Sequence, residues 1–138
     1  MAPRAEIAAV LDEFHAAAAV AAEARYFATL APDAVFIGTA PGERWAGDAF
    51  REFVHSYFSR GTGWAYTPSA RSIDIALDGR TAWFDETVDN AHYGECRGTG
   101  VLQLHEDGWK IEQYNLGIPI PDEIAPEVVA RVREMRPA

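Results

Sequence analysis

The sequence predicts an α+β fold in which N-terminal helices pack on a strongly curved antiparallel sheet, giving a cone-shaped domain with an internal pocket. Residues 3–19 and 48–58 each place apolar side chains at helical spacing. Residues 71–118 instead alternate apolar and polar side chains around two Asp-Gly turns, which is typical of half-buried antiparallel strands. Helices followed by a run of strands pack as two layers around one core.

The composition indicates one soluble domain, predicted to span residues 1–138. The net charge of −9 argues against nucleic acid and against anionic membrane surfaces as partners. Cys96 is the only cysteine, so no internal disulfide can form, and a reducing, cytoplasmic location is expected. The sequence has neither an apolar run of about 18 residues, as a membrane span requires, nor the apolar core of a secretory signal.

The first helix is predicted over residues 3–19, where Ile7, Leu11 and Phe14 share one stripe. A second helical stretch, either continuous with the first or separate, is expected to reach about Leu30 before Pro32 ends it.

Residues 34–38 (A-V-F-I-G) have the β-branched and aromatic content of a short strand. A loop follows, and Asp48 is expected to cap a helix that ends near Gly61. A strand is predicted over residues 64–67, interrupted at Pro68, and a short C-terminal helix over about 126–135.

The turn at Asp78-Gly79 fixes the register of the next hairpin. It places Arg71 opposite Glu86 and Ile73 opposite Phe84, and side chains directly opposite share a face. A carboxylate is therefore expected on the apolar face of the sheet, where a ligand pocket would lie.

A second Asp-Gly turn, at 107–108, predicts the last hairpin. Leu102 would face Gln113 and Gly100 would face Asn115, which puts both amides on the apolar face beside space left by glycine. The intervening turn at 89–94 leaves its register open, so Asp85 and Arg97 lie outside as an ion pair or, in a shifted register, form an alternative pocket pair.

Several of these features together resemble a known superfamily. The strand A-V-F-I-G, the amphipathic helix after W-A-G-D, and the ending R-G-T-G-V-L…G-W-K-I-E-Q-Y-N-L are similar to nuclear transport factor 2-like proteins, in particular the SnoaL-like branch. The resemblance implies a bent sheet, a pocket between sheet and helices, and a homodimer through the outer sheet face. Members include polyketide cyclases, isomerases, dehydratases and non-enzymatic modules, so the fold does not settle the function.

Two departures from the family pattern bear on catalysis. The isomerase branch would place its general-base aspartate near Gly38, which cannot take a proton. The cyclase-like branch often has an inward acid or histidine on the last strand, where the predicted register puts Gln113 and Asn115. Neither chemistry transfers directly.

Glu86 with Arg71 is the sharpest candidate pair. Glu86 could act as a general acid or base in the pocket, or the two could form a cross-strand ion pair. Gln113 and Asn115 could bind a ligand carbonyl or hydroxyl, or could satisfy backbone groups where the sheet bends.

Four further side chains are candidates for lining the pocket: Tyr26, Tyr57, Trp45 and His15. Ordinary core packing is the alternative for the aromatic ones. The four histidines have no metal-ligand spacing, so no metal is expected. No cofactor is expected either.

Two functions remain open at this point. The first is a small-molecule-binding domain with a mostly apolar pocket and cofactor-independent acid–base catalysis in which Glu86 transfers the proton. The second is a non-catalytic homodimeric interaction or structural module. It would use an apolar outer sheet face around Val101, Tyr114 and Leu116, with Trp83 as an anchor.

Overall fold

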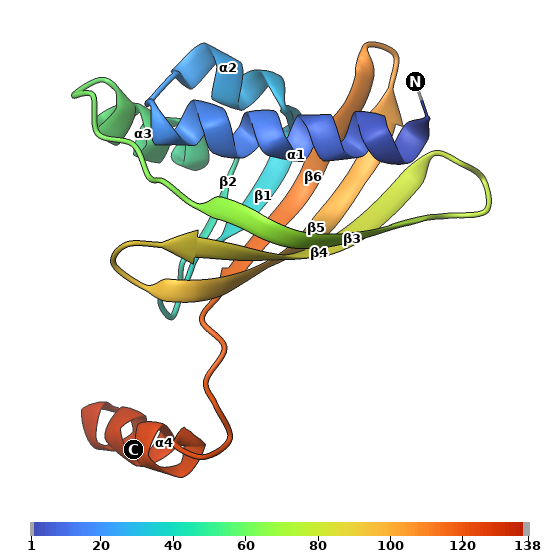
Figure 1. Cartoon of the computed structure of the whole chain (residues 1–138). Coiled ribbons are helices and arrows are strands. Elements are labelled where there is room, and N and C mark those ends of the chain that lie inside the picture. The colour runs from blue at the N-terminus through green and yellow to red at the C-terminus, as the bar shows by residue number, and fades with distance from the viewer. Residues whose placement is uncertain (1, 137–138) are drawn as a thin grey trace.

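The computed structural model describes residues 2–136 and confirms the α+β class. The helices are α1 (Pro3–Ala19), α2 (Glu23–Ala28), α3 (Gly47–Phe58) and α4 (Ala125–Met135). The strands are β1 (Leu30–Ile37), β2 (Arg44–Ala46), β3 (Thr67–Ile75), β4 (Thr81–Asn90), β5 (Gly94–His105) and β6 (Gly108–Gly117). Figure 1 shows α1, α2 and α3 on one side of the curved sheet and α4 on the other.

The six strands form one sheet in the order β2-β1-β6-β5-β4-β3. The sheet is mixed, because β1 runs parallel to β6 while the other neighbours pair antiparallel. The prediction of a wholly antiparallel sheet is wrong at this one pair. A hairpin forces two strands to run antiparallel, but β1 and β6 are far apart in the sequence and no turn sets their direction.

The inner face of the sheet packs against α1. Ile7, Leu11 and Phe14 of α1 are buried, as the helical stripe predicts. Phe14 stacks on Tyr26 of α2 with 4.9 Å between ring centroids and also contacts Tyr114 of β6 at 5.0 Å. The core between helices and sheet is therefore largely aromatic.

The β3–β4 hairpin has the register that the Asp78-Gly79 turn predicts. Arg71 pairs with Glu86 and Ile73 with Phe84, and Glu86 is buried on the inner face. The turn between β4 and β5 closes between Asn90 and Gly94, with Gly94 in the left-handed region at φ 72°.

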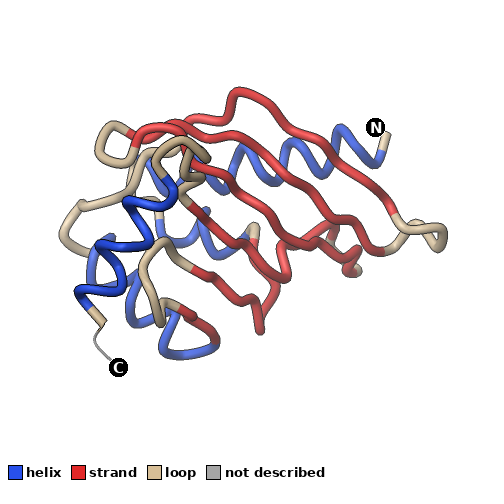
Figure 2. The backbone as a smooth tube through the Cα atoms, turned by 90° about the horizontal axis from the view of Figure 1, so that it is seen from below, coloured by secondary structure: helices blue, strands red, loops and turns tan. Residues whose placement is uncertain are grey.

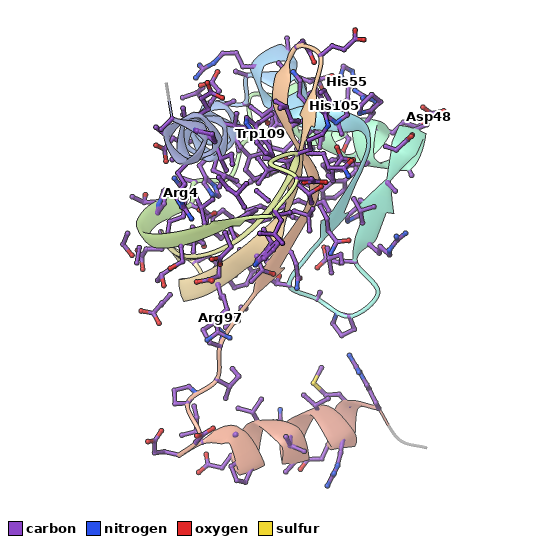
Figure 3. The ribbon with its side chains drawn as sticks, turned by 90° about the vertical axis from the view of Figure 1, so that its right-hand side faces the viewer. Arg4, Asp48, His55, Arg97, His105 and Trp109 are labelled. Carbon is purple, nitrogen blue, oxygen red and sulfur yellow. The ribbon has the colours of Figure 1, made fainter. Side chains whose placement is uncertain are left out.

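That turn settles the position of Asp85 and Arg97. Thr87 pairs with Arg97, and both Asp85 and Arg97 are exposed on the outer face. Figure 3 shows Arg97 on the side of the sheet that faces α4. The alternative placement of this pair in the inner pocket is therefore wrong, because β4 and β5 pair without a register shift.

The predicted facing of the last strand is wrong because β6 contains a bulge. Leu102 pairs with Ile111, while the preceding residue, Val101, pairs with Gln113, so Glu112 is the extra residue. A shift of one residue reverses every later side chain.

The bulge exchanges the two faces of β6 beyond Glu112. Tyr114 and Leu116 are buried on the inner face, where they pair with Gly100 and Gly98. Gln113 and Asn115 lie on the outer face instead. The apolar outer patch predicted around Tyr114 and Leu116 is consequently wrong for these two residues.

Smaller differences concern element ends. The predicted strand at 64–67 begins only at Thr67, and it continues through Pro68 by way of a register shift before Ala70. The N-cap of α3 is Ala46, and Asp48 lies in the first turn of the helix, where its charge is still favourable.

A C-terminal arm follows the sheet. Residues 118–124 carry the chain away from the domain, and Figure 1 shows α4 standing apart below the sheet. In Figure 2, which views the molecule from that side, α4 overlaps other elements. No residue of α4 is buried. Its exposed apolar residues therefore remain uncovered within one copy of the chain.

Candidate functional site

A buried polar cluster centred on Glu86 lies on the inner face of the sheet. The Glu86 side chain is 0% exposed. Nε2 of His15 lies 2.6 Å from Oε2 of Glu86, and the hydroxyl of Tyr114 donates to the same oxygen at 2.7 Å. Arg71 donates from Nε to Oε1 at 2.8 Å. Three donors thus surround one carboxylate.

Four separate elements deliver these side chains: α1 carries His15, β3 carries Arg71, β4 carries Glu86 and β6 carries Tyr114. Gly98 of β5 lies between Glu86 and Leu116 in the pairing of the strands. A Cβ at Gly98 would lie 2.1 Å from the Tyr114 hydroxyl oxygen. The missing side chain therefore makes room for the tyrosine that reaches Glu86.

The cluster keeps Glu86 ionised. Burial raises the pKa of Glu86 and is the largest single influence, but hydrogen bonds and charge from His15, with Tyr114 and Arg71, outweigh it and the pKa is lowered. Burial, together with the neighbouring Glu86 charge, raises the pKa of Tyr114, so the phenol stays protonated and donates.

Arg71 links the cluster to α1. Its Nη1 donates to Oδ1 of Asp12 at 2.9 Å and to the carbonyl oxygen of Ala8 at 3.3 Å. Burial lowers the pKa of Arg71, but the hydrogen bonds to Glu86 and Asp12 and their charges raise it by a larger amount. The pKa is therefore raised overall, and the guanidinium stays charged. The cation therefore partly balances the buried carboxylate.

A mostly aromatic cavity of about 210 Å³ lies between α3 and the β1–β2 end of the sheet, and it is named the large cavity here to distinguish it from a much smaller neighbour. Its lining residues are Tyr26, Phe36, Gly38, Thr39, Glu43, Trp45, Phe50, Phe53, Trp64, Tyr66, Tyr93 and Leu116. Glu43 is the one charged residue among them. Such a lining fits a flat apolar ligand.

A second, small cavity lies between this space and the polar cluster. It has a volume of about 10 Å³, and His15 and Tyr114 belong to its lining. It shares four lining residues with the large cavity: Phe36, Trp64, Tyr66 and Leu116. The two cavities therefore lie side by side, and the small one has about the volume of one water molecule.

The structure brings together some of the predicted site residues and separates others. His15, Arg71 and Glu86 meet in the cluster, and Tyr26 and Trp45 line the large cavity. Tyr57 is 38% exposed and belongs to the lining of neither cavity. Gln113 and Asn115 face outward, and their predicted inner position is wrong.

Tyr114 is the residue of the polar cluster that the sequence prediction missed. A signal for it exists: the apolar residues of the last strand stand at 109, 111, 114 and 116, so the alternation slips by one residue at Glu112-Gln113. Two adjacent polar residues between two alternating runs indicate a bulge. With that bulge in place, Tyr114 falls on the face of Glu86.

No group of three or more His, Cys, Asp or Glu side chains within residues 2–136 is arranged to hold a metal ion. Among the helices of that range, none is long and apolar enough to cross a membrane.

Comparison with known proteins identifies the family. A sequence profile described as the SnoaL-like domain matches residues 7–121, most of the chain. The chain belongs to the SnoaL-like domain family. The nuclear transport factor 2-like superfamily that the sequence resembles is thereby confirmed. A comparison with curated proteins found no match.

Solved structures share the fold of this SnoaL-like domain at low sequence identity. A candidate aromatic ring hydroxylase of Novosphingobium aromaticivorans is 20% identical with a TM-score of 0.70, over 86% of this chain and 90% of that one. A nuclear transport factor 2-like protein of unknown function from Pseudomonas putida is 16% identical with a TM-score of 0.70, over 89% and 92%. A candidate dehydratase of Streptomyces avermitilis is 12% identical with a TM-score of 0.68, over 84% and 95%.

Proposed function

We propose that this SnoaL-like domain binds a small, flat, mostly apolar organic molecule and carries out cofactor-independent acid–base chemistry on it. The observation that supports this most is the position of the buried His15–Glu86–Tyr114 cluster directly beside the aromatic cavity. The similarity in fold to a candidate aromatic ring hydroxylase and a candidate dehydratase is compatible with such a ligand.

His15, rather than Glu86, is the proton-transfer group in this proposal. The ionised Glu86 only accepts hydrogen bonds, so the proton between the two residues sits on Nε2 of His15. Whenever this imidazole is neutral with its proton on Nε2, its Nδ1 carries a lone pair that can take a proton. Imidazole is the side chain that most often gives and takes protons near neutral pH.

The lowered pKa of Glu86 makes this carboxylate a weak base. In this proposal Glu86 therefore orients His15 and stabilises the charged form of the imidazole. Its predicted role as the proton-transfer group stays untested, and three donors already occupy its oxygens. One water molecule in the small cavity would relay a proton between His15 and a ligand in the large cavity.

A side-chain NMR titration tests this function. We expect acetophenone, added to ¹⁵N-labelled protein, to shift the imidazole nitrogen signals of His15. His105, at the β5–β6 hairpin and in the lining of neither cavity, is the internal control whose signals should stay fixed. Binding of acetophenone that leaves the His15 signals unchanged would show that the cluster is a structural network of the core without contact to the ligand.

We also propose that the protein forms a homodimer. Two uncovered apolar surfaces support this proposal. On the outer sheet face, Trp83 is 49% exposed and pairs with Val101. On the arm, Ile124 at the N-cap of α4 forms a stripe at i, i+4 and i+8 with Val128 and Val132 of the helix. In the proposed dimer the outer faces pack together and each arm covers the partner.

The length of the arm fits this arrangement. Residues 118–121 precede the turn that leads into α4 and, fully extended, span roughly 13 Å, and two packed sheets stand about 10 Å apart. The arm therefore reaches past the partner's sheet. Light scattering that gives the mass of one chain at micromolar concentration would contradict the dimer.

A cytoplasmic location stays a prediction, and its support is the single unpaired Cys96.

A further inference from the structure

The one charged side chain in the lining of the large cavity belongs to Glu43, which directly precedes β2. The β1–β2 hairpin sets the face on which this side chain lies. Phe36 pairs with Trp45, and two residues beyond this pair the Gly38 N–H donates to the carbonyl oxygen of Glu43 at 2.8 Å. Residues two apart on a strand share a face. Glu43 therefore lies on the face of Phe36 and Trp45, which also line the cavity.

The carboxylate of Glu43 has no cation beside it. Its Oε1 accepts a hydrogen bond from the Ala40 N–H at 2.7 Å, and its Oε2 would lie 3.2 Å from a Cβ at Gly38, another lining residue. Glu43 is half-buried, and none of the ion pairs within residues 2–136 includes it. The lining contains no lysine, arginine or histidine. The negative charge of Glu43 thus lacks a counter-charge in the cavity.

Aromatic side chains surround this carboxylate. Eight of the twelve lining residues are Phe, Tyr or Trp. Tyr66 is a near neighbour of Glu43: burial, followed by electrostatic repulsion from Cys96, Tyr93 and Glu43, raises the pKa of Tyr66 to about 12, so its phenol stays neutral. Aromatic faces attract cations, and ammonium groups are commonly bound in aromatic cages. The lining therefore combines two features that favour a positive charge.

We infer that the large cavity binds an organic cation, a single aromatic ring with a short side chain whose protonated ammonium group pairs with Glu43. This inference rests on the proposed ligand-binding function and adds the charge of the ligand to it. The cavity of about 210 Å³ is larger than the 150 Å³ that suffices for benzene, which leaves room for the side chain. The ammonium group supplies the missing counter-charge, while the carboxylate repels an anion of the same size.

Calorimetric titration with three single-ring compounds of similar size tests the inference. Near neutral pH, benzylamine is a cation, benzyl alcohol is neutral and benzoate is an anion. The wild-type protein is expected to bind benzylamine about tenfold more tightly than benzyl alcohol, and to bind benzoate more weakly than either. Glu43→Gln should raise the Kd for benzylamine about five- to tenfold and leave the Kd for benzyl alcohol within about twofold.

The variants separate the local charge from the charge of the whole protein. In Glu43→Gln the amide oxygen can still accept from the Ala40 N–H, so the loop is expected to keep its shape. Glu52→Gln is the matched control, because Glu52 is exposed on α3 and lines neither cavity. It removes the same charge and should leave all three Kd values within about twofold. In the wild-type protein, added sodium chloride should weaken benzylamine binding and spare benzyl alcohol.

Several results would overturn the inference and leave the proposed function standing. One is an equal Kd of the wild-type protein for benzylamine and benzyl alcohol, and another is tighter binding of benzoate. A third is an equal loss of benzylamine affinity in Glu43→Gln and Glu52→Gln, since the preference would then come from the net charge of −9. Binding of acetophenone without binding of benzylamine is the fourth. If acetophenone and all three compounds fail to bind, the proposed function fails as well.

The indole N–H signals of the labelled protein report where benzylamine binds. Trp45 and Trp64 line the large cavity, whereas Trp83 is 49% exposed on the outer sheet face. Benzylamine is expected to shift the signals of Trp45 and Trp64 and to leave that of Trp83 unchanged. A shift of Trp83 alone would put the cation on the outer face and overturn the inference.

Discussion

Replacing Gly98 by alanine tests how the polar cluster is built. A Cβ at this position would lie 2.1 Å from the hydroxyl oxygen of Tyr114, 2.7 Å from its Cζ and 3.1 Å from Cγ of Glu86. The Gly98 backbone is not in the left-handed region, so alanine brings no backbone strain. The substitution therefore acts through steric contact with Tyr114 and Glu86.

The expected cost has two parts. Displacing Tyr114 breaks a buried hydrogen bond to a charged acceptor, which is worth about 1.5 to 3 kcal/mol. Forcing a methyl group into a filled core costs about 1 to 3 kcal/mol more. We therefore expect Gly98→Ala to lower the free energy of unfolding by about 3 to 5 kcal/mol, a large share of the stability of a typical domain.

Urea unfolding followed by circular dichroism measures this cost. Gly117→Ala is the control, because a Cβ at Gly117 meets nothing within 4 Å. On a Tyr114→Phe background the alanine should cost less, since the closest atom is gone, though Cζ still lies too near for full rescue. A Gly98→Ala protein within about 0.5 kcal/mol of Gly117→Ala would refute the packing described for the cluster.

Two further predictions concern acid sensitivity and the arm. The pKa of Glu86 is lowered in the folded protein from its ordinary 4.5, so its ionised form contributes stability that is full above this value and is lost as the pH falls through the lower folded value. Glu86→Gln should therefore flatten the loss of stability below about pH 4.5 in urea titrations, and an unchanged acid limb would contradict the assignment. Val132→Glu, on the apolar stripe of α4, should shift light-scattering masses toward the single chain, whereas Ala130→Glu on the opposite side of the helix should not; equal masses for both would count against the arm.

The first hairpin was predictable from the sequence because its turn has one geometry. Asp78-Gly79 sets the register of β3 and β4, and that register brings Arg71 opposite Glu86. The two residues then form an ion pair at 2.8 Å. Local turn chemistry carried this part of the site, since one turn fixes every pair in the hairpin.

The last strand was not predictable in the same way, because its error came from within the strand. The turn at 107–108 is correct, but Glu112 bulges and reverses the facing of the residues beyond it. Nε2 of His105 lies 2.6 Å from Oε2 of Glu112, and this contact helps to fix the side chain of the bulged residue. Tyr114 thereby took the inner place that Asn115 was expected to have.

His15 shows a different limit. The helical stripe predicts that α1 buries Phe14, and His15 follows it directly. Whether His15 also faces inward depends on how α1 is rotated on the sheet, and this rotation is set by contacts of α1 with β3 and β6. The bond from Arg71 to the carbonyl oxygen of Ala8 is one such contact, at a separation of 63 residues. Periodicity within a helix does not contain that information.

The lining of the large cavity contains a carboxylate, although the strand position expected to carry one holds a glycine. Gly38 stands where the resemblance would place the base of the isomerase branch. The turn through Gly42, at φ 78°, folds the chain back so that Gly38 donates from its N–H to the carbonyl oxygen of Glu43 at 2.8 Å.

Glu43 consequently occupies the space that a side chain at Gly38 would fill. Its Cδ lies 3.1 Å from the position of a Gly38 Cβ, and its Oε1 accepts a hydrogen bond from the Ala40 N–H at 2.7 Å. Glycine at 38 and glutamate at 43 therefore act together: the first leaves room for the carboxylate of the second. A carboxylate thus belongs to the lining of the large cavity although the strand itself offers none.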